Sequence, residues 1–238
     1  MHESAEPVNK TSLGSSYRVM HRTVALTIGR LVRVAALGLV LSVPWAYDIA
    51  RMQLAAARLG PRAVASLPAL QSLLQPAPQA DDETQLAAVN EFFNRRIVFR
   101  DDAQAWGQTD RWTSPLELLD KGEGDCEDYV IAKYFSLLAL GMPAQRLRLV
   151  YVRAHVGGES IAHMVLAYYA QPGAEPLILD NLVGSVRPAS RRPDLTPVFS
   201  FNSDGMWEGT GSQSAGHPQS RLSRWREVLA KAQAEGFF

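Results

Sequence analysis

The chain has 238 residues, with 24 basic and 24 acidic side chains and 47% hydrophobic residues. This length and apolar content are enough for one domain with a substantial core and an N-terminal extension. The net charge is zero, and neither a Lys/Arg run nor a glycine-rich phosphate loop occurs. General nucleic-acid binding, which usually requires a basic patch, is therefore not expected.

The N-terminal part of the chain has the pattern of an export signal. Arg22, Arg30 and Arg33 precede or enter an apolar stretch from Leu31 to Tyr47, and residues 21–47 contain no acidic side chain. This pattern is typical of a secretory signal peptide or an uncleaved signal anchor, and the alternative is a buried core helix. We expect residues 1–49 to be a leader that directs export of the chain, with cleavage near Ala46 or membrane anchoring left open.

The composition of residues 50–82 predicts a linker, in which Ala50 to Leu59 could form a short helix or a membrane-proximal stalk. Prolines at positions 61, 68, 76 and 78 lie among alanines and glutamines, which is typical of loosely structured segments. Residues 83–238 are predicted to form the folded domain. Its first helix follows Asp81 or Asp82, either of which can cap it, and an apolar face contains Leu86, Val89 and Phe93.

The remaining elements predict an α+β domain, in which helices pack on an antiparallel sheet. A short helix begins at Ser114 and Pro115 and stops at Gly122, and a second, mostly apolar helix begins near Cys126, with Asp125 as its cap. Strands are expected at Leu147–Val152, Met164–Tyr169 and Leu177–Leu179, and a final amphipathic helix at Arg221–Glu235. Trp207 and Trp225 are candidates for an interface, with core packing as the alternative.

Cys126 is the only cysteine of the chain, so it can form no internal disulfide and no multi-thiolate metal site. It is either a reactive nucleophile or a buried filler. Its position at a loop-to-helix junction among carboxylates is poorly suited to a filler. The N-terminus of a helix favours an anion and lowers a thiol pKa, and an imidazole partner would complete the activation.

His163 is the best-placed histidine for this role. It begins the apolar segment Ala162–Leu166, where it is either a satisfied core histidine or a positioned base. Asp180 ends the apolar strand after Leu179 and is either a turn residue or the partner of the imidazole. Because adjacent antiparallel strands would bring the two together, we predict a Cys126–His163–Asp180 triad.

The acidic residues around Cys126 require an explanation, because neighbouring negative charges raise a thiol pKa. A bound hard cation would neutralise them, and carboxylate oxygens are calcium ligands. We therefore predict a Ca²⁺ site at Asp125 and Glu127. Further donors are expected from Asp101, Asp102, Asp110 or Asp128. Glu123 is interpreted as a cap or solvated charge.

The carbonyl attacked by the thiol would need an oxyanion hole. The backbone N–H of Cys126 is one natural donor. Trp106 or Gln108 is a candidate for the second, and both have packing or loop structure as the alternative.

Several segments in order resemble the bacterial transglutaminase-like cysteine proteinases, and within them the LapG-type periplasmic proteases. The resemblance covers roughly Gln85 to Glu235. It rests on Phe92-Phe93-Asn94-Arg95-Arg96-Ile97, Trp106-Gly107-Gln108, Gly124-Asp125-Cys126-Glu127-Asp128, Ala132 to Leu137, Ala162-His163-Met164-Val165-Leu166, Leu179-Asp180-Asn181-Leu182, Arg187-Pro188-Ala189-Ser190 and Phe199 to Asn202.

The resemblance implies a papain-like or transglutaminase-like fold and a thioester-forming endopeptidase with a Cys126, His163 and Asp180 triad. It also implies calcium dependence through Asp125 and Glu127. The implied substrate is a large repeat-containing surface adhesin, cut near its N-terminus so that it is released and the biofilm disperses. The implied partner is an inner-membrane cyclic di-GMP receptor of the LapD type, which sequesters the protease.

Two other functions remain open from the sequence. The same fold and thioester would serve a transglutaminase that transfers the acyl group to an amine. A non-enzymatic calcium-responsive binding module that retains the triad by descent is the third reading.

Overall fold

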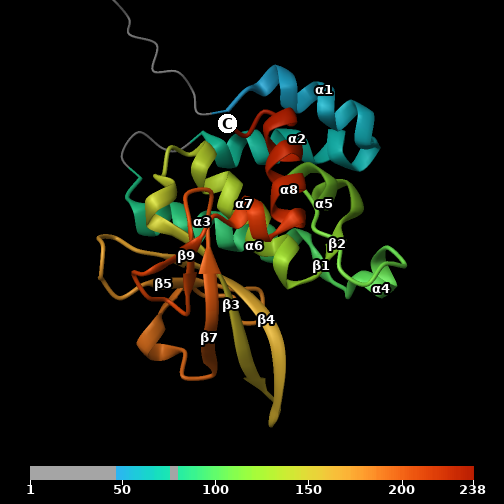
Figure 1. Ribbon diagram of the computed structural model, residues 1–238. Helices are drawn as coiled ribbons and strands as arrows, with labels where there is room; N and C mark the ends of the chain where they lie inside the picture. Colours follow the sequence, from blue (N-terminus) through green and yellow to red (C-terminus); the bar gives the residue numbers. More distant parts are fainter. Residues whose placement is uncertain (1–46, 76–79) are drawn as a thin grey trace, which may run out of the picture. The chain divides into compact units, whose positions relative to one another are not determined.

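Helices gather on one side of an antiparallel sheet in this computed structural model (Figure 1). Residues 47–75 and 80–238 are described, and they belong to the compact unit Val43–Phe238. The predicted leader, residues 1–49, lies almost entirely outside them. In these two ranges, no helix is both long and apolar enough to span a bilayer.

The helices occupy both ends of the described chain. They are α1 (Ile49–Leu59), α2 (Pro61–Leu74), α3 (Asp82–Arg96), α4 (Asp102–Ala105), α5 (Pro115–Lys121), α6 (Cys126–Ala139), α7 (Pro218–Arg221) and α8 (Ser223–Ala234), with 3-10 turns η1 (Ala144–Arg146) and η2 (Ala189–Arg191).

The main sheet has the order β6-β5-β4-β3-β7-β8-β9, with every neighbouring pair antiparallel. Its strands are β3 (Leu147–Val156), β4 (Glu159–Tyr168), β5 (Leu177–Leu179), β6 (Arg187–Pro188), β7 (Leu195–Phe201), β8 (Met206–Glu208) and β9 (Ser214–Gly216). A separate parallel pair joins β1 (Val98–Phe99) to β2 (Glu123–Gly124). The expected α+β layout is therefore confirmed, and the β3–β4 hairpin is longer than the sequence predicted.

Local sequence signals explain where α5 begins and ends. Ser114 caps the helix, and Ser114 and Glu117 form a reciprocal capping box behind Pro115. Gly122 closes the helix with a φ of 70°, a conformation that favours glycine. These boundaries bring the chain to β2 and then directly to Cys126.

The predicted linker is wrong for residues 50–74, which form most of α1 and all of α2. Along α2, Leu67, Leu70 and Leu74 share one buried face, and this spacing supports a helix although Pro68 interrupts its hydrogen bonds. The amide of Ala63 donates to Asp120 Oδ1 at 3.0 Å, which joins α2 to α5. The apolar face was therefore a better indicator than the proline content.

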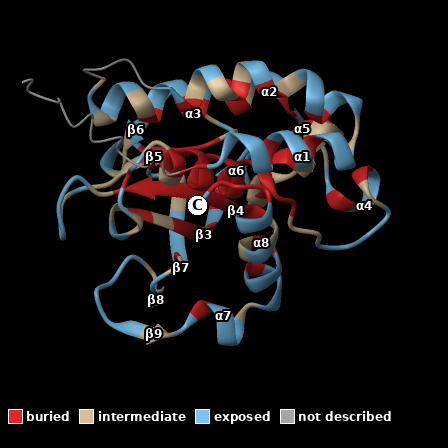
Figure 2. Ribbon diagram, turned by 90° about the horizontal axis from the view of Figure 1, so that it is seen from above, coloured by how far each residue is buried: buried red, intermediate tan, exposed pale blue. Residues whose placement is uncertain are grey.

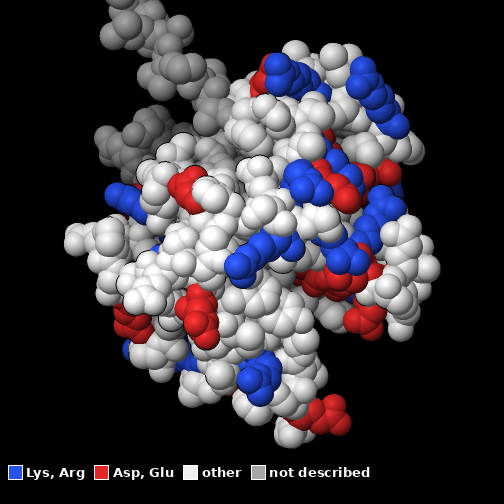
Figure 3. All heavy atoms as spheres, in the orientation of Figure 1, with Lys and Arg blue, Asp and Glu red and all other residues white. Residues whose placement is uncertain are grey.

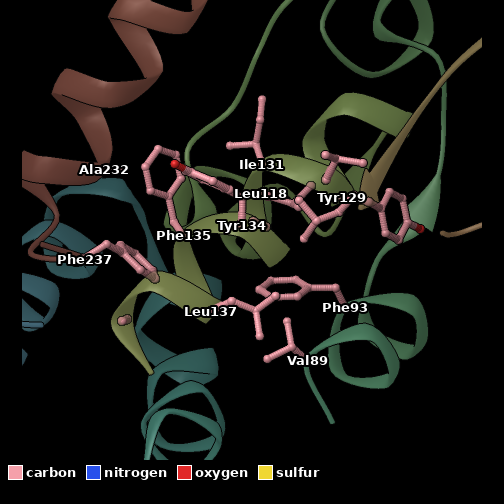
Figure 4. Packing of buried hydrophobic residues seen from close by; sticks show 14 of the residues in the cluster. Val89, Phe93, Leu118, Tyr129, Ile131, Tyr134, Phe135, Leu137, Ala232 and Phe237 are labelled. Atoms are coloured by element: carbon pink, nitrogen blue, oxygen red, sulfur yellow. The ribbon is translucent and has the colours of Figure 1, made fainter. Parts of the chain in front are cut away.

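Helix α6 is the centre of the core, and it is buried along most of its length (Figure 2). Leu137 of α6 lies beside Val89 and Phe93 of α3, whereas Phe135 faces the C-terminal segment with Phe237 (Figure 4). Trp225 of α8 is fully buried and stacks on Phe135 with ring centroids 5.7 Å apart. Trp225 therefore belongs to the core and is not an interface residue.

Candidate active site

Cys126 is the first residue of α6, and Asp125 occupies the N-cap position without a side-chain capping hydrogen bond. The thiol is half-buried and donates to Glu127 Oε2 over 3.1 Å. Gly124 allows the chain to pass close to α6, because a Cβ atom there would lie 2.6 Å from Asp128 Oδ2. The loop thus fixes the thiol at a helix N-terminus, as the sequence predicted.

His163 and Asp180 are brought together on neighbouring strands. His163 lies in the middle of β4, three residues before the pair Leu166–Leu179 that joins β4 to β5, and Asp180 directly follows β5. The imidazole Nε2 lies 2.8 Å from Asp180 Oδ1, and both side chains are buried. The hairpin argument for their proximity is confirmed, although His163 does not begin its strand.

The thiol meets the same strand. Helix α6 packs on β4, and a hydrogen bond from the main chain of Met164 reaches Cys126. Because Met164 directly follows His163, the thiol lies beside the imidazole-bearing segment. With Nε2 bound to Asp180, Nδ1 is the imidazole nitrogen left for the thiol.

Asp180 carries partners that the sequence did not indicate. Its Oδ1 accepts the N–H of Leu182 at 3.0 Å, its carbonyl accepts Asn94 Nδ2 at 2.7 Å, and its Oδ2 pairs with Arg192 Nη2 at 2.7 Å. Burial would raise the pKa of Asp180, but the bonds from His163, Leu182 and Arg192 outweigh it and lower the pKa to about 2. The carboxylate is therefore anionic at neutral pH.

Acidic side chains from three segments converge next to the thiol. Asp102 heads two groups, one with Asp110 and Glu127 and one with Asp125 and Asp128, in each of which the ligand atoms lie within 4.8 Å of one another. Acidic side chains gather on the face where Figure 1 places α4 and the β1–β2 pair (Figure 3). Three buried oxygens have no hydrogen-bond partner: Asp102 Oδ1, Asp125 Oδ1 and Asp128 Oδ2.

Burial and crowding raise the pKa of Asp125, Asp128 and the Cys126 thiol. Burial, then the charges of Glu127 and Asp128, raises the pKa of Asp125 to about 10. Burial also raises the pKa of Asp128 to about 7, against hydrogen bonds from Thr113. For Cys126, burial and then Glu127 raise the pKa of the thiol well above its ordinary value. Without a counter-charge, the site therefore opposes thiolate formation.

The donor set fits a hard divalent cation. Calcium takes oxygen ligands, mostly carboxylates and carbonyls, and three unpartnered carboxylate oxygens here converge. Asp125 and Glu127 both belong to the cluster, each in a different group, and Asp102 joins the two groups. Neither group contains Asp101 among the described residues.

Two other residues have structural partners. Glu123 pairs with Arg100 at 2.9 Å, so it is occupied outside the cluster, in agreement with its expected structural role. The Trp106 ring lies between Arg111 at 4.0 Å and Lys121 at 4.8 Å. These contacts give the Trp106 ring packing partners, but its indole N–H has no hydrogen-bond partner, so Trp106 and Gln108 both stay predictions for the oxyanion hole.

The chain matches known proteins in sequence and in structure. The profile described as bacterial transglutaminase-like cysteine proteinase BTLCP matches residues 70–194. Legionella pneumophila LapG, treated with EGTA, is 35% identical over 78% of this chain and 97% of its own, with a TM-score of 0.68. Its calcium-bound form is 35% identical over 77% and 98%, with a TM-score of 0.64. No curated protein gave a significant match.

Proposed function

The chain belongs to the bacterial transglutaminase-like cysteine proteinases, and from this membership we propose that it is a calcium-dependent cysteine endopeptidase of the periplasm. Its substrate is the N-terminal region of a large surface adhesin, whose release promotes biofilm dispersal. The observation that carries the proposal is the buried pair of His163 on β4 and Asp180 just after β5, beside a lone thiol at the start of α6.

The proposed reaction follows from this geometry. His163, oriented by Asp180, takes the Cys126 proton through Nδ1, and Sγ attacks the scissile carbonyl. The backbone N–H of Cys126 is not needed for helix hydrogen bonding and is free to donate to the oxyanion. The amine leaves with the proton from His163, and a thioester remains on Cys126. His163 then deprotonates a water molecule, which hydrolyses the thioester.

The acidic cluster explains why this reaction needs calcium. Asp102, Asp125, Asp128 and Glu127 would hold the ion, with Asp110 at the exposed end. Calcium supplies positive charge that offsets the carboxylates near the thiol. Glu127 links the acidic cluster to the thiol, because its Oε2 accepts a hydrogen bond from the Cys126 thiol. If Glu127 served as a ligand of the ion, its hydrogen bond with the thiol would be weakened and the thiol would be free to pair with His163.

Control by cyclic di-GMP, like the adhesin substrate and the periplasmic location, rests on family resemblance alone. An inner-membrane receptor of the LapD type would sequester the protease through its periplasmic domain. Export by the N-terminal leader, or anchoring by it, would place the two proteins in the same compartment.

The test is incubation of the purified protein with an N-terminal adhesin fragment, in calcium or in excess EGTA. We expect cleavage in calcium only, and none with Cys126→Ala. A Glu123→Gln variant is the matched control, since Glu123 lies in the same loop but is paired with Arg100. Mass spectrometry should find a new carboxyl terminus. An isopeptide link would instead indicate acyl transfer, and cleavage by Cys126→Ala would contradict the nucleophile.

A further inference from the structure

Arg192 lies next to the proposed triad, on the far side of Asp180 from His163. It follows η2, and only 4% of its surface is exposed. We propose that Arg192 is a positioning residue, which fixes the Asp180 carboxylate and through it the His163 imidazole. This inference adds a fourth member to the proposed catalytic group.

The two oxygens of Asp180 have separate partners. Oδ1 accepts from His163 Nε2 at 2.8 Å and from the Leu182 N–H at 3.0 Å, whereas Oδ2 pairs with Arg192 Nη2 at 2.7 Å. Because the two oxygens have partners in different segments, hydrogen bonds at Oδ1 and an ion pair at Oδ2, rotation of the carboxylate about its χ2 axis would break one of these contacts. Its orientation sets the direction of the imidazole, so loss of Arg192 would free both.

Arg192 is itself held by Asp194. Its Nε donates to Asp194 Oδ1 at 3.0 Å and its Nη2 to Oδ2 at 2.7 Å, which is the forked geometry that arginine forms with carboxylates. The Asp194 carbonyl accepts the N–H of His155 at 2.9 Å, near the end of β3. The guanidinium therefore bridges the segment before β7 and the residue after β5.

Lys133 is the other cation that faces Asp180, and it is fully buried in α6. Its Nζ has no hydrogen-bond partner and forms no ion pair with Asp180, whereas Arg192 Nη2 forms an ion pair with Asp180 Oδ2 at 2.7 Å. Burial lowers the pKa of Lys133 to about 7, despite the charge of Asp180. Arginine stays charged at every pH at which proteins fold, so Arg192 is the permanent cation of the pair.

The test compares Arg192→Met, which keeps the side-chain length without charge, with Arg191→Met at the exposed neighbouring position. For adhesin cleavage we expect Arg192→Met to lower kcat on the order of 10²-fold with KM changed less than about twofold, as for a misplaced catalytic group. Arg192→Lys should recover part of kcat, because a lysine keeps the positive charge but lacks the rigid planar fork of the guanidinium. Arg191→Met should match the wild type.

A second readout needs no substrate. In ¹⁵N-labelled protein, the His163 Nε2–H proton should give a strongly downfield signal that Arg192→Met loses and Arg191→Met keeps. If the wild type does not cut the adhesin, the proposed substrate is wrong, while this signal still decides the role of Arg192. A retained signal in folded Arg192→Met, or a kcat within about twofold of wild type, would overturn the inference.

Asp194→Asn covers the case in which Arg192→Met does not fold. The Asp194 side chain is 33% exposed and bonds the guanidinium, so its amide should be tolerated while Arg192 loses its anchor. We expect a several-fold lower kcat at constant KM and a broadened Nε2–H signal. An unchanged kcat and signal in Asp194→Asn would count against the positioning role.

Discussion

Asp125→Asn should make the protein more stable in EGTA and less stable in calcium than the wild type. Within one group, Asp125, Asp102 and Asp128 have ligand atoms no more than 4.8 Å apart. Two unit charges at roughly this distance repel by about 3.5 kcal/mol at an effective dielectric constant of about 20. Asparagine removes both repulsions that involve position 125 and keeps the side-chain shape.

At neutral pH, Asp125 avoids this repulsion by keeping its proton, because its pKa is raised to about 10, and asparagine removes the free-energy cost of keeping that proton. We expect a gain of about 2 kcal/mol in EGTA at pH 7.5, which corresponds to roughly 6 °C in the unfolding midpoint for a domain of this size. In calcium at about 100 times its dissociation constant, the wild type should gain about 2.7 kcal/mol. Asp125→Asn should gain much less, so the order of stability inverts.

The stability difference between Asp125→Asn and the wild type should also depend on pH. The pKa of Asp125 is raised to about 10, so the folded protein retains a proton that the unfolded chain releases above about pH 4. Calcium-free wild type therefore loses stability as pH rises from 4 toward 10. Asp125→Asn removes this contribution, and its advantage in EGTA should be larger at pH 8 than at pH 6.

The assay is thermal unfolding by circular dichroism, in EGTA and in calcium, at both pH values. Glu123→Gln is the control, because Glu123 is paired with Arg100 and should leave the calcium-induced shift unchanged. The reasoning is refuted if Asp125→Asn is less stable than the wild type in EGTA, or if calcium raises both midpoints equally.

Three further changes test other parts of the fold. Lys133→Met should stabilise the protein at pH 7 by a few kcal/mol. Burial lowers the pKa of Lys133 to about 7, so the folded protein pays for the loss of a proton that the unfolded chain keeps, and this cost grows as the pH falls from about 10 to 7. Denaturant midpoints should therefore show a larger gain at pH 7 than at pH 10, and equal gains would contradict the prediction. Gly124→Ala should lower the free energy of unfolding by about 1–3 kcal/mol and reduce the calcium-induced shift of the unfolding midpoint, because its Cβ would lie 2.6 Å from Asp128 Oδ2. The control Gly184→Ala faces open space and should change neither quantity. Trp225→Ala should cost about 3–5 kcal/mol and remove the near-ultraviolet signal of the core, and a loss below about 1 kcal/mol would argue against its full burial.

Elements with local signals were predictable from the sequence. Ser114, Pro115 and Gly122 delimit α5 through a cap, a fixed φ and a left-handed residue. The strand after Pro176 and the aspartate that ends it likewise follow from apolar pattern alone. Such features depend on residues close in the chain, which one sequence displays directly.

Long-range partners were not predictable. Arg192 meets Asp180 from twelve positions away, and Asn94 reaches the Asp180 carbonyl from α3; in the sequence, each is an ordinary polar residue. Asp102 was only one of several donor candidates, because its role as the residue shared by two groups depends on how α4 folds back onto α6. Helix α2 is not predicted, because four prolines between residues 61 and 78 are typical of a linker, whereas the buried contacts of its leucines become visible only in the fold.

Glu127 connects the two halves of the proposed site. Its Oε2 accepts a hydrogen bond from the Cys126 thiol over 3.1 Å. A ligand atom of the same residue lies within 4.8 Å of ligand atoms of Asp102 and Asp110. A carboxylate beside the thiol favours the protonated form, so the charge of Glu127 opposes catalysis unless it is neutralised within the cluster. Glu127→Gln removes both the charge that suppresses the thiolate and a carboxylate ligand of the cluster, and cleavage in EGTA shows which of the two losses matters more. If suppression is its main effect, this variant should retain cleavage in EGTA that the wild type lacks.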